Sequence, residues 1–253
     1  GRLEWRPLDD ADKEAALRAP PGAGRALAVE AASVVVTHGG QRYRLPRTAA
    51  VYDDPFPTGW PRALREVVTE RNLFNAHGTI YEVPRADAGG FQRLRPITTH
   101  HKRIRDFAAW RGLLVLTGVR AGARPDGHCH PSADGAAAVW FGEVDDLWRL
   151  GAPAGVGGPW KDTAVAANEP SDPYLMAGYR TKFLALSHRA AQPVAFTIEV
   201  DFAANGEWSR YCELVVPPGR TLKHRFPAGY SAHWVRLKTD RAARASAIFT
   251  YRP

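Results

Sequence analysis

The sequence predicts an all-β fold, and three observations support that prediction. Apolar or alternating runs of strand length recur along the chain, turn signals such as Asn205-Gly206 separate them at short intervals, and helical periodicity is nearly absent. The 23 glycines and 20 prolines are typical of a chain with many turns. Sandwiches, barrels and propellers are built from strands of this kind.

The expected strands follow one another along the chain. The N-terminal part predicts a hairpin in which the turn His38-Gly39-Gly40 joins 26–37 to 41–45. Further strands are expected at 79–83, 91–98, 104–110, 113–119, 137–144, 147–150, 174–179, 182–187, 194–202, 209–216, 221–226, 232–238 and 245–251. The stretch 151–173 is rich in glycine and proline, so we expect a loop there without strands.

A weak internal recurrence favours a β-propeller that spans 1–253 as a single domain. Units that begin near His77, Asp106 and Asp172 each contain a polar residue, a short strand, a tight turn and a second apolar strand. In a propeller, Asp106 and Asp172 would occupy equivalent positions of inner strands. The units are unevenly spaced, so two packed β-sandwich domains are the alternative, with a boundary near residue 190 and 191–253 as one sandwich.

Charge and composition limit the expected partners. The net charge of +8 favours a polyanion, but the arginines are scattered, so neither a nucleic-acid stripe nor a nucleic-acid partner is predicted. No apolar run approaches the roughly 20 residues of a membrane span, and no membrane partner is expected. No signal peptide is visible, but a start at Gly1 without Met fits a truncated chain from which an export signal was removed. Cys129 and Cys212 can form one disulfide or remain thiols.

Four stretches carry a family resemblance: NLFNAHGTIYEVP, IRDFAAWRGLLVLTG, AAVWFGEVDDLW and PWKDTAVAANEPSDPYLMAGY. They resemble segments of large uncharacterised bacterial β-propeller proteins associated with polysaccharide degradation. The resemblance covers residues 70–190 and concerns the style of the blades. It implies a secreted or periplasmic protein that acts on polysaccharides. Propellers host hydrolases, lyases, lectins and scaffolds, so the resemblance leaves the reaction open.

Two histidine motifs precede expected strands. Asn75 and His77 stand before 79–83, and His100 and His101 open a cationic cluster before Asp106. An imidazole can act as general base or acid near neutral pH, and the cluster can bind a carboxylate or sulfate. A turn histidine bonded to the backbone, or an exposed basic loop, explains the same residues without catalysis.

The stretch 155–173 is expected to carry recognition groups. Its aromatic, ammonium, amide and carboxylate side chains are Trp160, Lys161, Asp162, Asn168, Glu169 and Asp172. A ring stacks on a sugar face and polar groups bond hydroxyls, while paired carboxylates can cleave a glycosidic bond. We expect these groups to meet the histidines at one end of a propeller channel. A plain connector between blades or domains is the alternative.

No metal or other cofactor is predicted. His128 and His130 point to the same side of an extended segment, but no third ligand stands at a supporting spacing. Trp110, Trp140 and Trp148 are expected in the core rather than as sugar platforms.

The sequence therefore predicts a carbohydrate-active protein that cleaves a polysaccharide, acidic rather than neutral given the charge, by glycoside hydrolysis or β-elimination. The candidate catalytic residues are His77, His101, Asp106, Glu169 and Asp172. The candidate substrate-binding residues are Asn75, His100, Trp160, Lys161, Asp162, Asn168 and Arg180. A non-catalytic glycan-binding module and a scaffold subunit are the alternatives, and the oligomeric state is left open.

Overall fold

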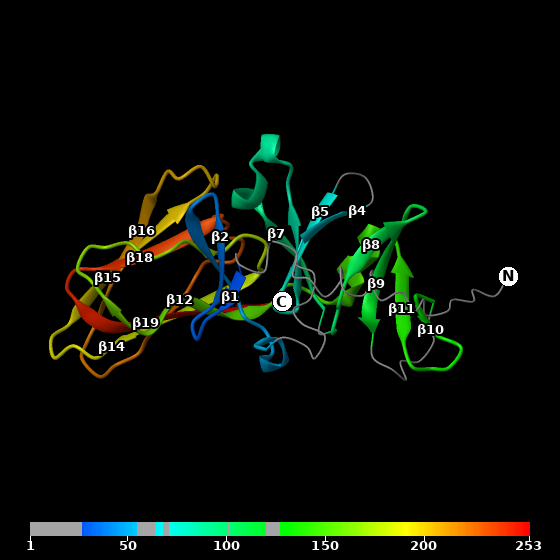
Figure 1. Ribbon diagram of the computed structural model, residues 1–253. Coiled ribbons are helices and arrows are strands. Elements are labelled where there is room, and N and C mark those ends of the chain that lie inside the picture. The colour runs from blue at the N-terminus through cyan, green and yellow to red at the C-terminus, as the bar shows by residue number, and fades with distance from the viewer. Residues whose placement is uncertain (1–26, 55–63, 68–70, 101, 120–126) are drawn as a thin grey trace.

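The protein is all-β, as predicted. The computed structural model describes residues 27–54, 64–67, 71–100, 102–119 and 127–253, and the strands of these residues form four sheets. Figure 1 shows the sheets following one another along the molecule, with the strands of 155–252 at one end, β4–β7 in the middle and β8–β11 at the other end. Across the described ranges, no helix is long and apolar enough to cross a membrane.

The largest sheet contains the predicted hairpin, but the expected strand 26–37 is divided into two antiparallel strands by a turn at 30–33. Its strands, in spatial order, are β1 (Leu27–Val29), β2 (Val34–His38), β3 (Gln41–Leu45), β13 (Tyr174–Leu175), β18 (Trp234–Thr239), β15 (Val194–Asp201) and β16 (Ser209–Val216). Gly39 and Gly40 both have positive φ, as a two-residue hairpin turn requires. The pairing of β3 with β13 is parallel, which attaches the N-terminal hairpin to the strands of the C-terminal half.

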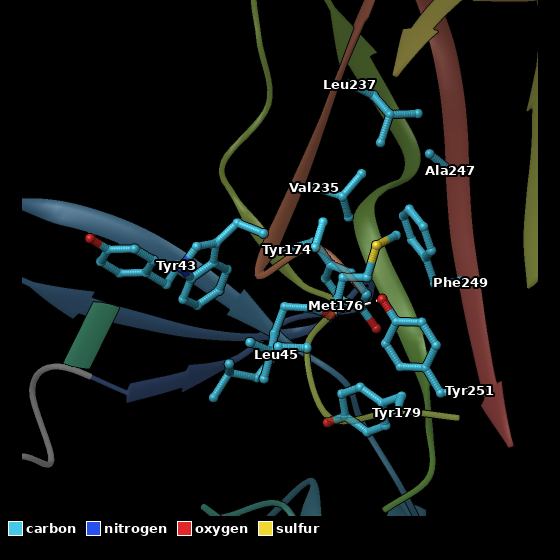
Figure 2. Packing of buried hydrophobic residues seen from close by; sticks show 14 of the residues in the cluster. Tyr43, Leu45, Tyr174, Met176, Tyr179, Val235, Leu237, Ala247, Phe249 and Tyr251 are labelled. Carbon is cyan, nitrogen blue, oxygen red and sulfur yellow. Dashed lines mark hydrogen bonds between the residues drawn. The ribbon is translucent and has the colours of Figure 1, made fainter. Parts of the chain in front are cut away.

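A second sheet faces the C-terminal part of the first. Its order is β12 (Gly155–Val165), β19 (Ala243–Arg252), β14 (Thr181–His188) and β17 (Leu222–Arg225). Alternate residues of both sheets join one hydrophobic core. In Figure 2, Val235 and Leu237 of β18 lie beside Ala247 and Phe249 of β19. The strands of 155–252 therefore form a β-sandwich.

Two further antiparallel sheets pack against each other. One is the meander β4 (Leu64–Val67), β5 (Arg71–Ala76), β6 (Thr79–Val83) and β7 (Arg95–Thr99). The other has the order β10 (Cys129–Pro131), β11 (Ala138–Gly142), β9 (Leu113–Val119) and β8 (Phe107–Trp110). They share a small core, to which β5 and β6 contribute Leu73 and Ile80. Phe74 and Tyr81, which alternate with these residues, join the sandwich core instead.

Several details differ from the sequence prediction. The expected loop 151–173 contains the eleven-residue strand β12. The expected strand 147–150 lies in a 3-10 helix, η6 (Val144–Leu150), whose capping box pairs Glu143 with Asp146. Shorter 3-10 helices are η2 (Ala50–Tyr52), η4 (Ala86–Ala88) and η5 (Gly90–Arg93), the last of which replaces the first residues of the expected strand 91–98.

The expected repeat of blades is not present in the C-terminal half. Asp106 precedes the edge strand β8 of a four-stranded sheet, whereas Asp172 precedes β13, an internal strand of the seven-stranded sheet, so the two positions are not equivalent. Residue 190 lies between β14 and β15, which belong to the two facing sheets of the same sandwich. Over the ranges described, the sheets close into no barrel.

Candidate functional site

An open pocket of about 330 Å³ runs along β12. Its other walls are the turn before β2, strand β3 and the segment 169–172. Four residues singled out from the sequence line it: Trp160, Lys161, Glu169 and Asp172. The structure thus brings together part of the predicted recognition segment, with Trp160 and Lys161 on strand β12 and Glu169 and Asp172 in the irregular segment that follows it.

Two irregularities in β12 determine which way its side chains point. The register against β19 shifts between Gly157 and Trp160 and again between Trp160 and Thr163. Such bulges re-aim side chains along a strand. Trp160 consequently enters the core and is only 6% exposed, while Lys161 is exposed. The Trp160 ring is therefore not available as a sugar-stacking platform, which corrects the sequence prediction.

One guanidinium organises the acidic wall of the pocket. The Arg44 side chain is 11% exposed; its Nε donates to Asp172 Oδ2 at 2.8 Å and its Nη1 to Glu30 Oε2 at 2.9 Å. The same Nη1 reaches Ser33 Oγ at 3.0 Å. Arg42, on the same face of β3, contacts both carboxylates at 3.1 and 3.2 Å. Asp172 and Glu30 are thus held in place by two arginines.

Two charged groups of the pocket remain available to a ligand. Lys161 and Glu169 are exposed, and neither forms an ion pair with any residue in the described part of the chain. The pocket therefore offers an ammonium donor and a carboxylate acceptor beside a rigid ion-paired wall.

His77 lies in a separate cluster that is linked to the pocket. Its Nδ1 accepts the backbone N–H of Thr48 at 2.9 Å, so its Nε2 carries the hydrogen and donates to Asp53 Oδ1 at 2.8 Å. Arg47 binds Asp53 at 2.6 Å and also the backbone carbonyls of Glu30 and Ala31, beside the pocket. Both ring nitrogens of His77 are hydrogen-bonded, and its side chain is only 1% exposed. This geometry suits His77 to holding its hydrogen-bond partners in place better than to proton transfer.

Burial and hydrogen bonding set the charge states in this cluster. Burial lowers the pKa of His77 and outweighs the opposing effect of Asp53. Burial alone would raise the pKa of Asp53, but hydrogen bonds from His77 and Arg47 lower it overall. The cluster is therefore a neutral imidazole between a backbone N–H and a carboxylate.

The histidine cluster predicts a dependence of stability on pH. The folded state keeps His77 neutral where the unfolded chain, with an ordinary histidine pKa near 6.5, already binds a proton. The stability that neutral His77 contributes should therefore be fully present above about pH 6.5. It should be lost as the pH is lowered toward the pKa of His77 in the folded state. Thermal melts of the wild type and of His77→Asn between pH 8 and 5 test this, because asparagine tolerates the positive φ of this position. The melting temperature of the variant should fall less steeply with decreasing pH than that of the wild type. Equal slopes for the two proteins would contradict a neutral His77 in the folded state.

The other histidine motif lies in the interior. His100 Nδ1 accepts the backbone N–H of Lys102 at 3.0 Å, and its Nε2 contacts Asn75 Oδ1 at 3.1 Å. His100 and Asn75 are 3% and 6% exposed, so neither contacts solvent substantially. His101 lies outside the described residues. The structure does not bring His77, His100 or Asn75 into the lining of the pocket.

The remaining predicted site residues are dispersed. The Asp106 carboxylate accepts the backbone N–H of Phe107 at the start of β8. Asp162 pairs with Arg189 and Arg244 on the surface. Asn168 donates its backbone N–H to Thr239 O, and Arg180 is exposed just before β14. None of the four lines the pocket.

Reasoning from the sequence missed two members of the pocket, Glu30 and Arg44. A signal for Arg44 was present, because Arg42 and Arg44 alternate in the predicted strand 41–45 and must share a face. Glu30 stands in a turn, where alternation does not indicate which side chains share a face. Of the tryptophans expected in the core, only Trp140 is buried; Trp110 is 46% and Trp148 59% exposed.

Among the described residues, no group of three His, Cys, Asp or Glu side chains is placed to hold a metal ion. His128 Nδ1 lies 2.9 Å from Phe141 O, and its ring stacks on Trp140. Cys129 and Cys212 are not joined by a disulfide to each other, which resolves the alternative left open by the sequence.

Comparison with known proteins gives little guidance. No protein-family model matches the chain, and no curated protein matches it. A crystal structure of PirA is 14% identical with a TM-score of 0.22, covering 39% of this chain and 84% of that one. A crystal structure of an exo-β-1,3-galactanase from Phanerochaete chrysosporium with galactose is 9% identical with a TM-score of 0.23, covering 87% and 65%. Similarities this weak assign neither a fold nor an activity.

Proposed function

We propose that this protein recognises a carbohydrate in the pocket beside β12. The observation that supports this is the pairing of a rigid wall, in which Arg44 fixes Asp172 and Glu30, with the exposed Lys161 and Glu169. The pocket volume of about 330 Å³ lies within the range of small-ligand sites. A sugar hydroxyl both donates and accepts hydrogen bonds, so it suits a pocket that offers both kinds of group.

Cleavage of a polysaccharide is the second candidate function. Glu169 and Asp172 line the same pocket, as the two carboxylates of a glycoside hydrolase would. Lys161 beside them could neutralise a uronate carboxylate in a β-elimination. Asp172, however, already accepts hydrogen bonds from two arginines, which suits it to a fixed recognition role. Recognition without cleavage is therefore the version that we favour.

The proposal also includes a propeller-like arrangement of the β4–β7 and β8–β11 sheets. The β4–β7 and β8–β11 sheets pack face to face through a shared core, as neighbouring blades do. We propose that these two sheets are blade units that adjoin the sandwich.

Binding of neutral oligosaccharides tests the pocket. Calorimetric titration with a panel of neutral oligosaccharides should identify a ligand, and Lys161→Ala and Glu169→Gln should each weaken it by about tenfold or more, because each removes a hydrogen bond to a charged group. Measurement of released reducing ends on the same panel separates binding from cleavage.

Matched controls carry the same change of charge away from the pocket. The control for Lys161→Ala is Arg149→Ala, at an exposed residue of η6. The control for Glu169→Gln is Glu213→Gln, at an exposed residue of the edge strand β16. These variants should bind like the wild type. If the pocket variants bind every oligosaccharide as well as the controls do, the pocket is not the sugar site.

A further inference from the structure

The outer face of the β12-β19-β14-β17 sheet carries an unbalanced positive charge. Residues on β14 alternate between buried and partly exposed, and the partly exposed set, including Phe183 and Ala185, points away from the core. The register places Arg225 and Lys223 of β17 opposite these two residues. On the other side of β14, Arg252 of β19 pairs with Thr181. We call Phe183, Lys223, Arg225 and Arg252 the cationic face.

In the part of the chain that the structure describes, no acidic side chain offsets this charge locally. Strands β14, β17 and β19 contain no Asp or Glu at all. Within the described residues, the three basic members of the cationic face form no ion pair. Asp162, the acid beside β19, is paired with Arg189 and Arg244 further along the sheet.

The opposite face of the sandwich shows the ordinary arrangement. There Glu199 binds both Arg236 and Lys238, at 2.7 and 2.6 Å, and Glu213 binds Arg210 at 3.2 Å. The two outer faces of one sandwich thus differ in charge compensation. A surface whose cations lack partners attracts a polyanion, whereas compensated pairs do so weakly.

The arginines of the cationic face are also held in place. The Arg225 and Arg252 guanidinium groups lie 5.7 and 5.5 Å from the centre of the Phe183 ring. Cation–π contact with this ring limits the freedom of both groups. Because β17 and β19 flank β14, their backbones are about 10 Å apart, twice the usual strand spacing. The result is a pair of separated cations on the outer face of the sheet.

We propose that the cationic face binds a polyuronate, a polysaccharide that carries carboxylates along its chain. Guanidinium groups match planar carboxylates with two parallel hydrogen bonds. Single-stranded nucleic acid would need aromatic rings on which its bases stack, but the guanidinium groups already contact the Phe183 ring. The proposal is independent of the pocket, which is lined by β12 and the N-terminal hairpin.

Immobilised polygalacturonate provides the test, with neutral dextran and single-stranded DNA as comparison surfaces. The wild type should bind polygalacturonate at low salt, bind dextran negligibly, and bind DNA more weakly than polygalacturonate. The double variant Arg225→Ala/Arg252→Ala should bind polygalacturonate about tenfold or more weakly, and its affinity should depend less steeply on salt. Thermal melts establish that it is folded.

The control is Arg149→Ala/Arg210→Ala, which removes the same charge from exposed positions elsewhere. An equal loss in this control, or DNA binding at least as tight as polygalacturonate binding, would overturn the proposal. Binding of a neutral oligosaccharide by the Arg225→Ala/Arg252→Ala variant reports on the pocket separately, so the two proposals can fail independently.

Discussion

Replacement of Gly158 by alanine should destabilise the protein by about 3 kcal/mol and lower its melting temperature by roughly 6–12 °C. A Cβ on Gly158 would lie 1.8 Å from the carbonyl oxygen of Ala247, its neighbour on β19. The obstacle is backbone inside a paired sheet, so it cannot rotate away as a side chain could. Relief requires separation of β12 from β19, which breaks their hydrogen bonds and opens the sandwich core.

Gly127→Ala is the matched control for this prediction. Within the part of the chain that the structure describes, nothing lies within 4 Å of a Cβ at Gly127, and its φ is not in the left-handed region. Its stability should stay within about 0.5 kcal/mol of the wild type. Equal melting temperatures for the two variants would show that β12 does not approach β19 as closely as described.

Replacement of Arg44 by methionine should cost about 2–3 kcal/mol and should also abolish binding in the pocket. The substitution leaves Asp172, which is 25% exposed, and Glu30, which is 40% exposed, without their more buried partner. Removing one member of a fully buried pair costs about 3–5 kcal/mol, and the partial exposure of the carboxylates reduces that figure. Urea denaturation measures the change in the free energy of unfolding.

Arg42→Met separates this effect from a general loss of charge. Arg42 contacts the same two carboxylates, but its side chain is 47% exposed. Exposed ion pairs contribute at most about 1 kcal/mol, so this variant should remain close to the wild type. A loss as large as that of Arg44→Met would mean that burial does not distinguish the two arginines.

Local pattern was sufficient for most of the strands. The segment 194–202 alternates between apolar and small or polar residues, and both this segment and 209–216 are followed by turn signals; the structure has strands at Val194–Asp201 and Ser209–Val216. The hairpin around Gly39 and Gly40 was predictable because this glycine turn follows a β-branched apolar run. Alternation of apolar side chains is imposed by the two faces of a sheet, so it can be read without knowledge of the partner strand.

Strand β12 was not predictable, because its stability depends on a remote neighbour. Gly157 and Gly158 look like loop residues in the sequence, yet they allow the close approach of Ala32 O and Ala247 O. Intrinsic propensity favours a turn there, and pairing with β19 overrides it. Similarly, the capping box of Glu143 and Asp146 turned an expected strand into η6.

By itself, the sequence determined that the protein is built from short β-strands, and it supplied Trp160, Lys161, Glu169 and Asp172 as residues of interest. Only the tertiary structure decided that Trp160 turns inward and that Arg44 joins Asp172 across 128 positions. It also separated the histidines from the pocket. The physical reason is that alternation reports which face of a strand is buried, whereas the meeting of charged side chains depends on which strands pair, and that depends on contacts distant in the chain.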